Sequence, residues 1–231
     1  MNKRLITLGV SLPVLLAAAQ AAPWRDTPVA RLEALALIQT LNGEILASPS
    51  ATVTLERWCR THELAEPAQL LARPIAAGTA DAGAAVREHL QVSAGEPVRH
   101  RRVELRCGDH LLAIADNWYV PARLTPAMNR LLETTQLPFG KVVQPLSPQR
   151  QTLAATLLWS PLPEGWERSM RGAPLGAADA GPLSVPAALF AHQAIVFSGR
   201  HQPIAEVYEV FQRDILAFPE PVLSAPQPQG K

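Results

Sequence analysis

Two stretches far apart in the chain each have the pattern of a β-hairpin, and each carries a charged residue among apolar ones. They span residues 101–121 and 193–211. Each consists of two runs rich in β-branched and aromatic residues, joined by a turn at residues 108–110 or 199–202. An antiparallel sheet is therefore the framework that this chain most strongly predicts.

The second hairpin places Glu209 on the same side of a strand as Val207 and Phe211, because side chains alternate across a strand. If this side faces the core, the carboxylate loses water and needs a hydrogen-bond partner or a ligand. If it faces solvent, Glu209 is an ordinary surface acid. The composition of the strand leaves both alternatives open.

The first hairpin raises the same question for two arginines. Its apolar side contains Val103, Leu105 and Cys107, so alternation places Arg101 on the core side and Arg102 on the opposite side, unless the strand begins with a bulge. An arginine at the mouth of an apolar pocket can hold a planar carboxylate through two parallel hydrogen bonds. More often, such an arginine lies at the rim of the sheet.

Several segments together resemble the superfamily that unites chorismate lyases with the UTRA effector-binding domains of transcription regulators. The shared features are a Gly-Glu-Pro-Val entry, an Arg-Arg-Val strand, a Gly-Asp turn and a strand that ends in Val-Pro, at residues 95–98, 101–103, 108–109 and 120–121. Residues 135–141 are similar to the Thr-Pro-Leu-Gly-Arg segment of the lyase branch, and residues 209–211 are similar to its closing Glu-Leu-Phe.

The resemblance implies roles for individual residues. Glu209 matches the catalytic glutamate, and the spacing back from Cys107 matches Arg102 to the substrate-binding arginine. We prefer Arg102 on this spacing, although strand alternation favours Arg101. The other positions that match substrate-binding residues of the family are Ala51, Phe139, Gly140 and Lys141. At three of them, Ala51, Phe139 and Lys141, the family has methionine, leucine and arginine.

The fold implied by the resemblance is α+β, an antiparallel β-sheet with helices packed on one side and a pocket between them. The implied activity is the elimination of pyruvate from chorismate to give 4-hydroxybenzoate, without a cofactor or a metal. The departures from the family pattern favour an alternative, a non-catalytic periplasmic protein that binds small aromatic or cyclohexadiene carboxylates. A structural or interaction protein is a third possibility.

The first 21 residues have the pattern of a secretory signal peptide. A basic start is followed by an apolar run over residues 5–18 and by Ala-Gln-Ala at residues 19–21. The run is too short to span a bilayer comfortably, so we expect a periplasmic protein without a stable membrane span. We expect one domain over residues 22–218 and a disordered, proline-rich tail over residues 219–231. Export argues against an enzyme of cytoplasmic aromatic metabolism.

The first part of the predicted domain carries two helix patterns. One begins at Thr27 with Pro28 and has apolar residues at helical spacing up to residue 45, and the second begins near Thr52. Little room remains ahead of them for a helix-turn-helix, so we do not expect a transcription regulator of the usual UTRA type. Residues 76–83 and 172–186 are rich in Ala, Gly and Pro and predict loops.

The remaining composition excludes some classes of function. The net charge of +1 arises from mixed signs without a basic stripe, so we do not expect nucleic acid as a partner. The six histidines lack a metal-ligand spacing. Cys59 and Cys107 are the two cysteines, and an oxidising compartment would permit a disulfide between them. We favour two separately buried thiols, since Cys107 shares a side with Val103 and Leu105. The oligomeric state is not predicted.

Overall fold

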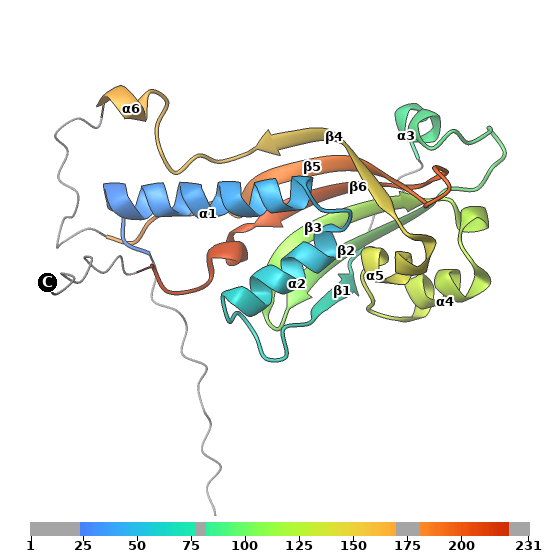
Figure 1. The fold of residues 1–231 in the computed structure, drawn as a ribbon, viewed down its shortest axis with the longest axis horizontal. Coiled ribbons are helices and arrows are strands. Elements are labelled where there is room, and N and C mark those ends of the chain that lie inside the picture. Colours follow the sequence, from blue (N-terminus) through green and yellow to red (C-terminus); the bar gives the residue numbers. More distant parts are fainter. Residues whose placement is uncertain (1–23, 77–81, 170–180, 222–231) are drawn as a thin grey trace, which may run out of the picture.

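The computed structural model describes residues 24–76, 82–169 and 181–221. It contains a six-stranded antiparallel sheet in the order β1-β2-β3-β6-β5-β4 (Figure 1). The strands are β1 (Leu70–Pro74), β2 (Arg99–Cys107), β3 (His110–Tyr119), β4 (Gln149–Leu157), β5 (Ala188–Phe197) and β6 (Pro203–Gln212). Both predicted hairpins are present, β2 with β3 and β5 with β6.

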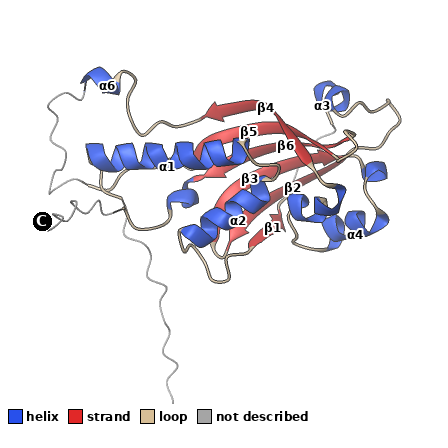
Figure 2. Cartoon of the chain, in the orientation of Figure 1, coloured by secondary structure: helices blue, strands red, loops and turns tan. Residues whose placement is uncertain are grey.

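Helices cover mainly one face of the sheet, which we call the inner face (Figures 1 and 2). The α-helices are α1 (Pro28–Leu46), α2 (Ala51–Thr61), α3 (Ala84–His89), α4 (Pro126–Thr134), α5 (Phe139–Val142) and α6 (Trp166–Ser169). The expected α+β architecture is confirmed. One helix departs from it, because α3 ends in His89, whose ring bonds the Glu206 carboxylate on the outer face.

The first two helices begin where the sequence predicts. The Thr27 hydroxyl accepts a hydrogen bond from the amide of Ala30 and caps α1, while Pro28 occupies its first turn. Helical spacing then places one stripe of α1 against the sheet, consisting of Ala30, Ala34, Ile38, Leu41 and Ile45. Helix α2 buries Leu55, Trp58 and Cys59 in the same way.

Strand alternation holds on the inner face. Val103, Leu105 and Cys107 of β2 are buried, and so are Val207, Glu209 and Phe211 of β6. Glu209 is therefore an inward-facing acid, which excludes the surface alternative. The turn between β2 and β3 needs Gly108, because its φ is +56° and an added Cβ would lie 2.7 Å from the Cβ of Ala65.

A disulfide joins Cys59 of α2 to Cys107 of β2, across a sequence separation of 48. The prediction of two free thiols is therefore wrong. Both side chains are buried as expected, but α2 crosses the end of β2 where the two sulfurs meet. A cross-link of this kind stabilises a fold by about 2–4 kcal/mol, mainly by restricting the unfolded chain. It holds α2 in a fixed position against the sheet.

The buried side chains form two separate clusters on the inner face. The larger cluster lies beneath α1 and α2 and includes Ile38, Leu55 and Val103. The smaller one lies beneath α4 and α5 and includes Phe139 and Val207. Two groups of helices that meet the sheet at different places leave a gap between them, and side chains from both clusters line it. This gap is the candidate site.

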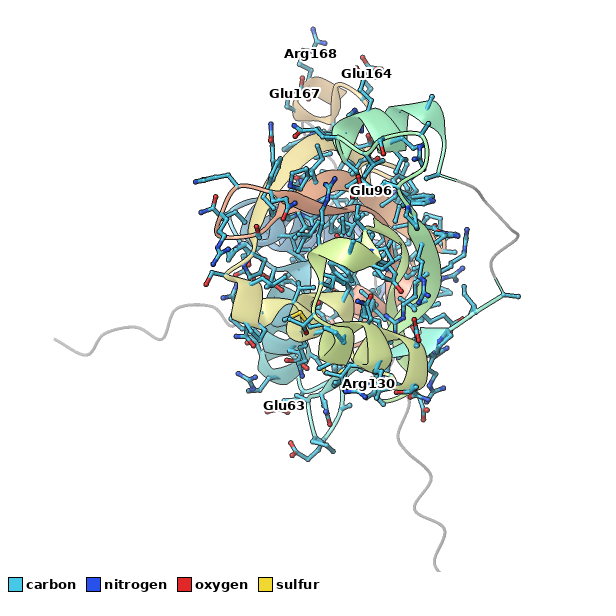
Figure 3. All side chains as sticks on the ribbon, turned by 90° about the vertical axis from the view of Figure 1, so that its right-hand side faces the viewer. Glu63, Glu96, Arg130, Glu164, Glu167 and Arg168 are labelled. Atoms are coloured by element: carbon cyan, nitrogen blue, oxygen red, sulfur yellow. A yellow bond between two sulfur atoms is a disulfide. The ribbon has the colours of Figure 1, made fainter. Side chains whose placement is uncertain are left out.

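Some sequence-based predictions fall on residues outside the described part of the chain. These are the signal peptide, nearly all of the proline-rich tail, and parts of the loops predicted at residues 76–83 and 172–186. Within the described ranges, none of the helices is long and apolar enough to cross a membrane, and no cluster of potential metal ligands is found. Charged side chains of both signs project from different parts of the surface, as Glu63, Arg130 and Arg168 illustrate (Figure 3).

Candidate functional site

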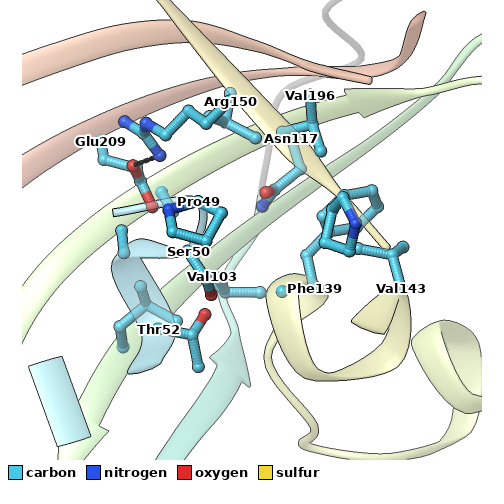
Figure 4. A pocket seen from close by; sticks show the side chains of 16 residues that line it. Pro49, Ser50, Thr52, Val103, Asn117, Phe139, Val143, Arg150, Val196 and Glu209 are labelled. Atoms are coloured by element: carbon cyan, nitrogen blue, oxygen red, sulfur yellow. Dashed lines mark hydrogen bonds and ion pairs between the residues drawn. The ribbon is translucent and has the colours of Figure 1, made fainter. Parts of the chain in front are cut away.

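The pocket lies between the inner face of the sheet, the start of α2 and the short helix α5 (Figure 4). The cavity itself has a volume of about 40 Å³, and the space among the lining atoms reaches about 480 Å³ when the part open to solvent is counted. Its lining is mostly apolar but includes charged and polar groups. The lining residues are Pro49, Ser50, Ala51, Thr52, Val103, Leu105, Ala115, Asn117, Phe139, Gly140, Val143, Pro148, Arg150, Val196, Val207 and Glu209.

A buried ion pair forms one wall of the pocket. The Nη1 of Arg150 donates a hydrogen bond of 2.7 Å to Oε2 of Glu209, and only 5% and 9% of the two side chains are exposed. The buried Glu209 thus has the partner that its position demands. Sequence reasoning missed Arg150, although a weak signal existed. Arg150 is the only charged residue in β4, but its neighbours Gln149 and Gln151 are polar, whereas Glu209 stands among apolar residues.

Arg150 has more donors than Glu209 accepts. Its Nε and Nη2 are also buried, and neither has a hydrogen-bond partner. A buried donor without a partner costs about 1–3 kcal/mol, more when the group is charged, so native proteins seldom leave one unsatisfied without a reason. Nε and Nη2 lie on one side of the planar guanidinium and match the two oxygens of a carboxylate. A carboxylate that reached this side of Arg150 could accept both hydrogen bonds.

A second group of donors surrounds the start of α2. Ser50 occupies the N-cap position but makes no side-chain capping bond, and its hydroxyl is buried without a partner. Helix α5 approaches closely here at Gly140, where an added Cβ would lie 2.8 Å from both Ser50 Oγ and Thr52 Oγ1. Gly140 therefore allows the two helices to close this side of the pocket.

His192 lies behind the ion pair, opposite Glu209 in the β5–β6 register. Its Nε2 is 2.7 Å from the side-chain oxygen of Asn42 on α1, so Nε2 donates and the unpartnered Nδ1 keeps its lone pair. Burial, and to a smaller extent the nearby Arg150, lower the pKa of His192 to about 4, against a smaller raising effect of Glu209. The ring is therefore neutral at pH 7 and adds no charge to the site.

Four of the predicted site residues line the pocket, namely Ala51, Phe139, Gly140 and Glu209. Ala51 begins α2, and Phe139 and Gly140 begin α5. The tightness of the α2–α5 contact explains why the residues are small at Ala51 and Gly140. The ring of Phe139 is buried against the pocket and lies 6.0 Å from that of Tyr119.

The other three predicted residues lie outside the lining. Arg102 is on the outer face, where its side chain is 42% exposed and lies 3.3 Å from Asp116, so the preference for Arg102 over Arg101 is wrong about the face. Strand alternation, not the spacing from Cys107, was the better guide. Lys141 points to Glu56, with Nζ 2.5 Å from Oε1, and not to the pocket.

Arg101 is buried on the inner face, as alternation predicts, but beside the pocket rather than in its lining. Its Nη2 donates to the carbonyl oxygens of Thr135 and Leu137 at 3.4 and 3.3 Å, and its Nη1 has no partner. Burial lowers the pKa of Arg101. Arg101 thus holds the segment that leads into α5, which supports the wall that contains Phe139.

The low pKa of His192 predicts a pH effect on stability. Because the folded protein keeps His192 neutral, the unfolded chain binds more protons as the pH falls below about 6.5. Between pH 7 and pH 4.5, this one group should lower the free energy of unfolding by roughly 2–3 kcal/mol. Urea denaturation should show a smaller loss in a His192→Leu variant. Equal losses in both proteins would contradict the prediction.

The fold can be compared with solved structures. The chain is similar to the effector domain of PhnF from Mycobacterium smegmatis, at 16% identity and a TM-score of 0.41, over 71% of this chain and 94% of that one. It is also similar to the C-terminal domain of Yurk from Bacillus subtilis, at 13% identity and a TM-score of 0.34, over 62% and 86%. These scores describe a partial overlap, so the resemblance to chorismate lyases stays a prediction.

No protein-family model matches the sequence. Among curated proteins, the chain is 45% identical over 201 residues to a protein of Sinorhizobium fredii described as uncharacterized protein y4mC. The alignment covers 87% of this chain and 84% of that protein, so the two share their length as well as their sequence. The chain therefore belongs to the same family as y4mC.

Proposed function

We propose that the pocket binds a small aromatic or cyclohexadiene carboxylate. The observation that carries the proposal is Arg150, which is buried in the pocket wall and keeps Nε and Nη2 without partners. A carboxylate would accept both hydrogen bonds in the planar geometry that guanidinium favours. With Glu209 on Nη1 and a ligand on the opposite side, the donors of the guanidinium would be better satisfied.

The rest of the pocket favours a flat apolar body on this carboxylate. Val103 on the sheet and Phe139 and Val143 of the covering segment supply apolar walls of the cavity (Figure 4). Val207 of the sheet also lines it. An aromatic or cyclohexadiene ring would replace water against these surfaces, at roughly 25 cal/mol per Å² of apolar area buried. Small ligand sites commonly combine such apolar walls with a few well-placed polar groups.

Binding without chemistry is the function that the geometry favours. In the resemblance to chorismate lyases, Glu209 acts on the substrate, but here its Oε2 already accepts a hydrogen bond from Arg150. The lysine matched to a second carboxylate contact, Lys141, is paired with Glu56. Arg102, matched to the substrate-binding arginine, lies on the outer face. Arg102 and Lys141 are therefore not in position to bind a substrate in the pocket as the lyase hypothesis requires, and Glu209 is already paired.

A lyase is the second candidate, because Glu209 still lines the pocket at the position matched to the catalytic glutamate. Chorismate would lose its enolpyruvyl group as pyruvate and leave 4-hydroxybenzoate, which balances without a cofactor. Glu209 would have to exchange its bond to Arg150 for one to the substrate and assist the movement of a proton. The observations on Arg150 apply to this candidate as well.

The binding proposal is tested by thermal shift and calorimetry with benzoate and 4-hydroxybenzoate. We expect both to stabilise the wild-type protein and the neutral analogue benzamide to bind at least about tenfold more weakly, since a charge-assisted pair is worth about 1.5–3 kcal/mol. The double variant Arg150→Met/Glu209→Gln, which leaves no unpaired charge, should lose the preference for the acids. Arg102→Met on the outer face is the matched control and should bind like wild type.

Equal binding of benzoate and benzamide would contradict a carboxylate site at Arg150. If neither the acids nor benzamide binds at millimolar concentration, the aromatic ligand class is wrong. In that case, acetate would still test the guanidinium as an anion site.

Catalysis is tested separately by mixing the protein with chorismate and following pyruvate and 4-hydroxybenzoate. We expect no release above the uncatalysed rate, because Glu209 is occupied by Arg150. Release that disappears in Glu209→Gln would replace the binding proposal with the lyase. Glu206→Gln, on the outer face of the same strand, is the control for effects on β6.

We further propose that the protein works outside the cytoplasm. The signal-peptide pattern of residues 1–21 supports this location, and so does the disulfide, since such bonds persist mainly in oxidising compartments. The intact mass of protein recovered from a bacterial periplasm should correspond to a chain that starts at Ala22. A cytoplasmic protein that retains Met1 or residues near it would contradict the proposal.

A further inference from the structure

The two edges of the sheet are protected very differently. Strand β1 has five residues, and its backbone donors that point away from β2 are satisfied within the chain. The amide of Leu70 donates to Glu56 Oε1, and the amide of Ala72 donates to the carbonyl of Gln136, both at 2.8 Å. Pro74 has no amide hydrogen. This edge therefore offers no donor to another strand.

The other edge, β4, lacks these protections, and the interruption that its pairing shows is a register shift at residue 153. It has nine residues and, among the described residues, pairs only with β5. Alternate N–H and C=O groups of an edge strand point away from the sheet and invite a further strand. Charged side chains, which normally discourage such pairing, are absent from residue 151 to residue 163.

The second half of β4 is open to solvent, and it carries exposed leucines. Leu153 and Leu157 are 39% and 41% exposed, and the adjoining Leu158 is 47% exposed. They supply three of the seven large exposed hydrophobic residues in the described part of the chain. An edge strand with unpaired backbone groups and exposed leucines is a suitable surface for contact with another protein chain, which would bond the backbone groups and bury the leucines.

We propose that β4 pairs with β4 of a second copy of this chain, antiparallel about a two-fold axis, so that two sheets join edge to edge. Across a two-fold axis, residue i of one copy faces residue j of the other, and residue j faces residue i. The side chains of the strand must therefore be compatible with those of the same strand in the second copy. An uncharged segment meets this condition, because no like charges oppose each other. The single charge of β4, Arg150, is directed into the pocket and away from the partner.

The chain, expressed at full length, is tested by analytical ultracentrifugation over a range of concentrations. We expect a dimer that Leu153→Lys and Leu157→Lys each weaken by at least about tenfold, since every lysine is present twice in a two-fold contact. Both leucines are exposed within one copy, so these changes leave its fold intact. Leu131→Lys on α4, where Leu131 is 37% exposed, is the matched control and should dimerise like wild type.

Hydrogen exchange locates the contact. Amides of residues 149–157 should be protected at high protein concentration and exchange faster on dilution. A monomer at every concentration would overturn the proposal, and so would a dimer that both lysine variants leave unchanged. Protection of these amides that does not depend on concentration would assign the edge to another segment of the same chain, and would equally overturn it.

Discussion

The ion pair between Arg150 and Glu209 is the constraint around which the inner face of the sheet is arranged. Two charges stand there between two apolar clusters, and removing one of them would leave the other buried and unpaired, at a cost of about 3–5 kcal/mol. Replacing both by apolar residues is often neutral or stabilising in other proteins. Stability alone therefore does not explain the pair, and the open donors of Arg150 point to a ligand as its reason.

The pocket depends equally on how the covering helices are held. The disulfide fixes α2 to β2, and the indole of Trp58 donates to the carbonyl of Ile215 at 2.8 Å, so the last turn of α2 is anchored. Gly140 lets α5 approach Ser50 and Thr52 from the other side. These contacts hold the donors of the site in place before a ligand arrives, which reduces the entropy lost on binding.

Local pattern was enough to predict the hairpins and to place Arg101 on the inner side of its strand, because alternation across a strand needs no knowledge of the rest of the fold. Whether Glu209 faces the core or solvent stayed open at that level, and the structure decides it. It failed where the answer depended on contacts between distant segments. The disulfide forms because α2 crosses β2, and no spacing in the chain shows that crossing. Arg150 was overlooked because its strand is short of β-branched residues and largely exposed, so it lacks the usual signature of a strand.

The same strand connects the site to the surface. Arg150, the proposed anchor for a carboxylate, belongs to the edge strand, whose backbone is held by β5 on one side only. A second copy paired along the other side would hold that backbone from both directions and restrict the arginine that it carries. Because binding free energies are linked, a ligand that orders Arg150 and β4 would favour pairing by the same amount that pairing favours the ligand. Binding of a ligand in the pocket and pairing of two copies along β4 would then both depend on the ordering of this strand.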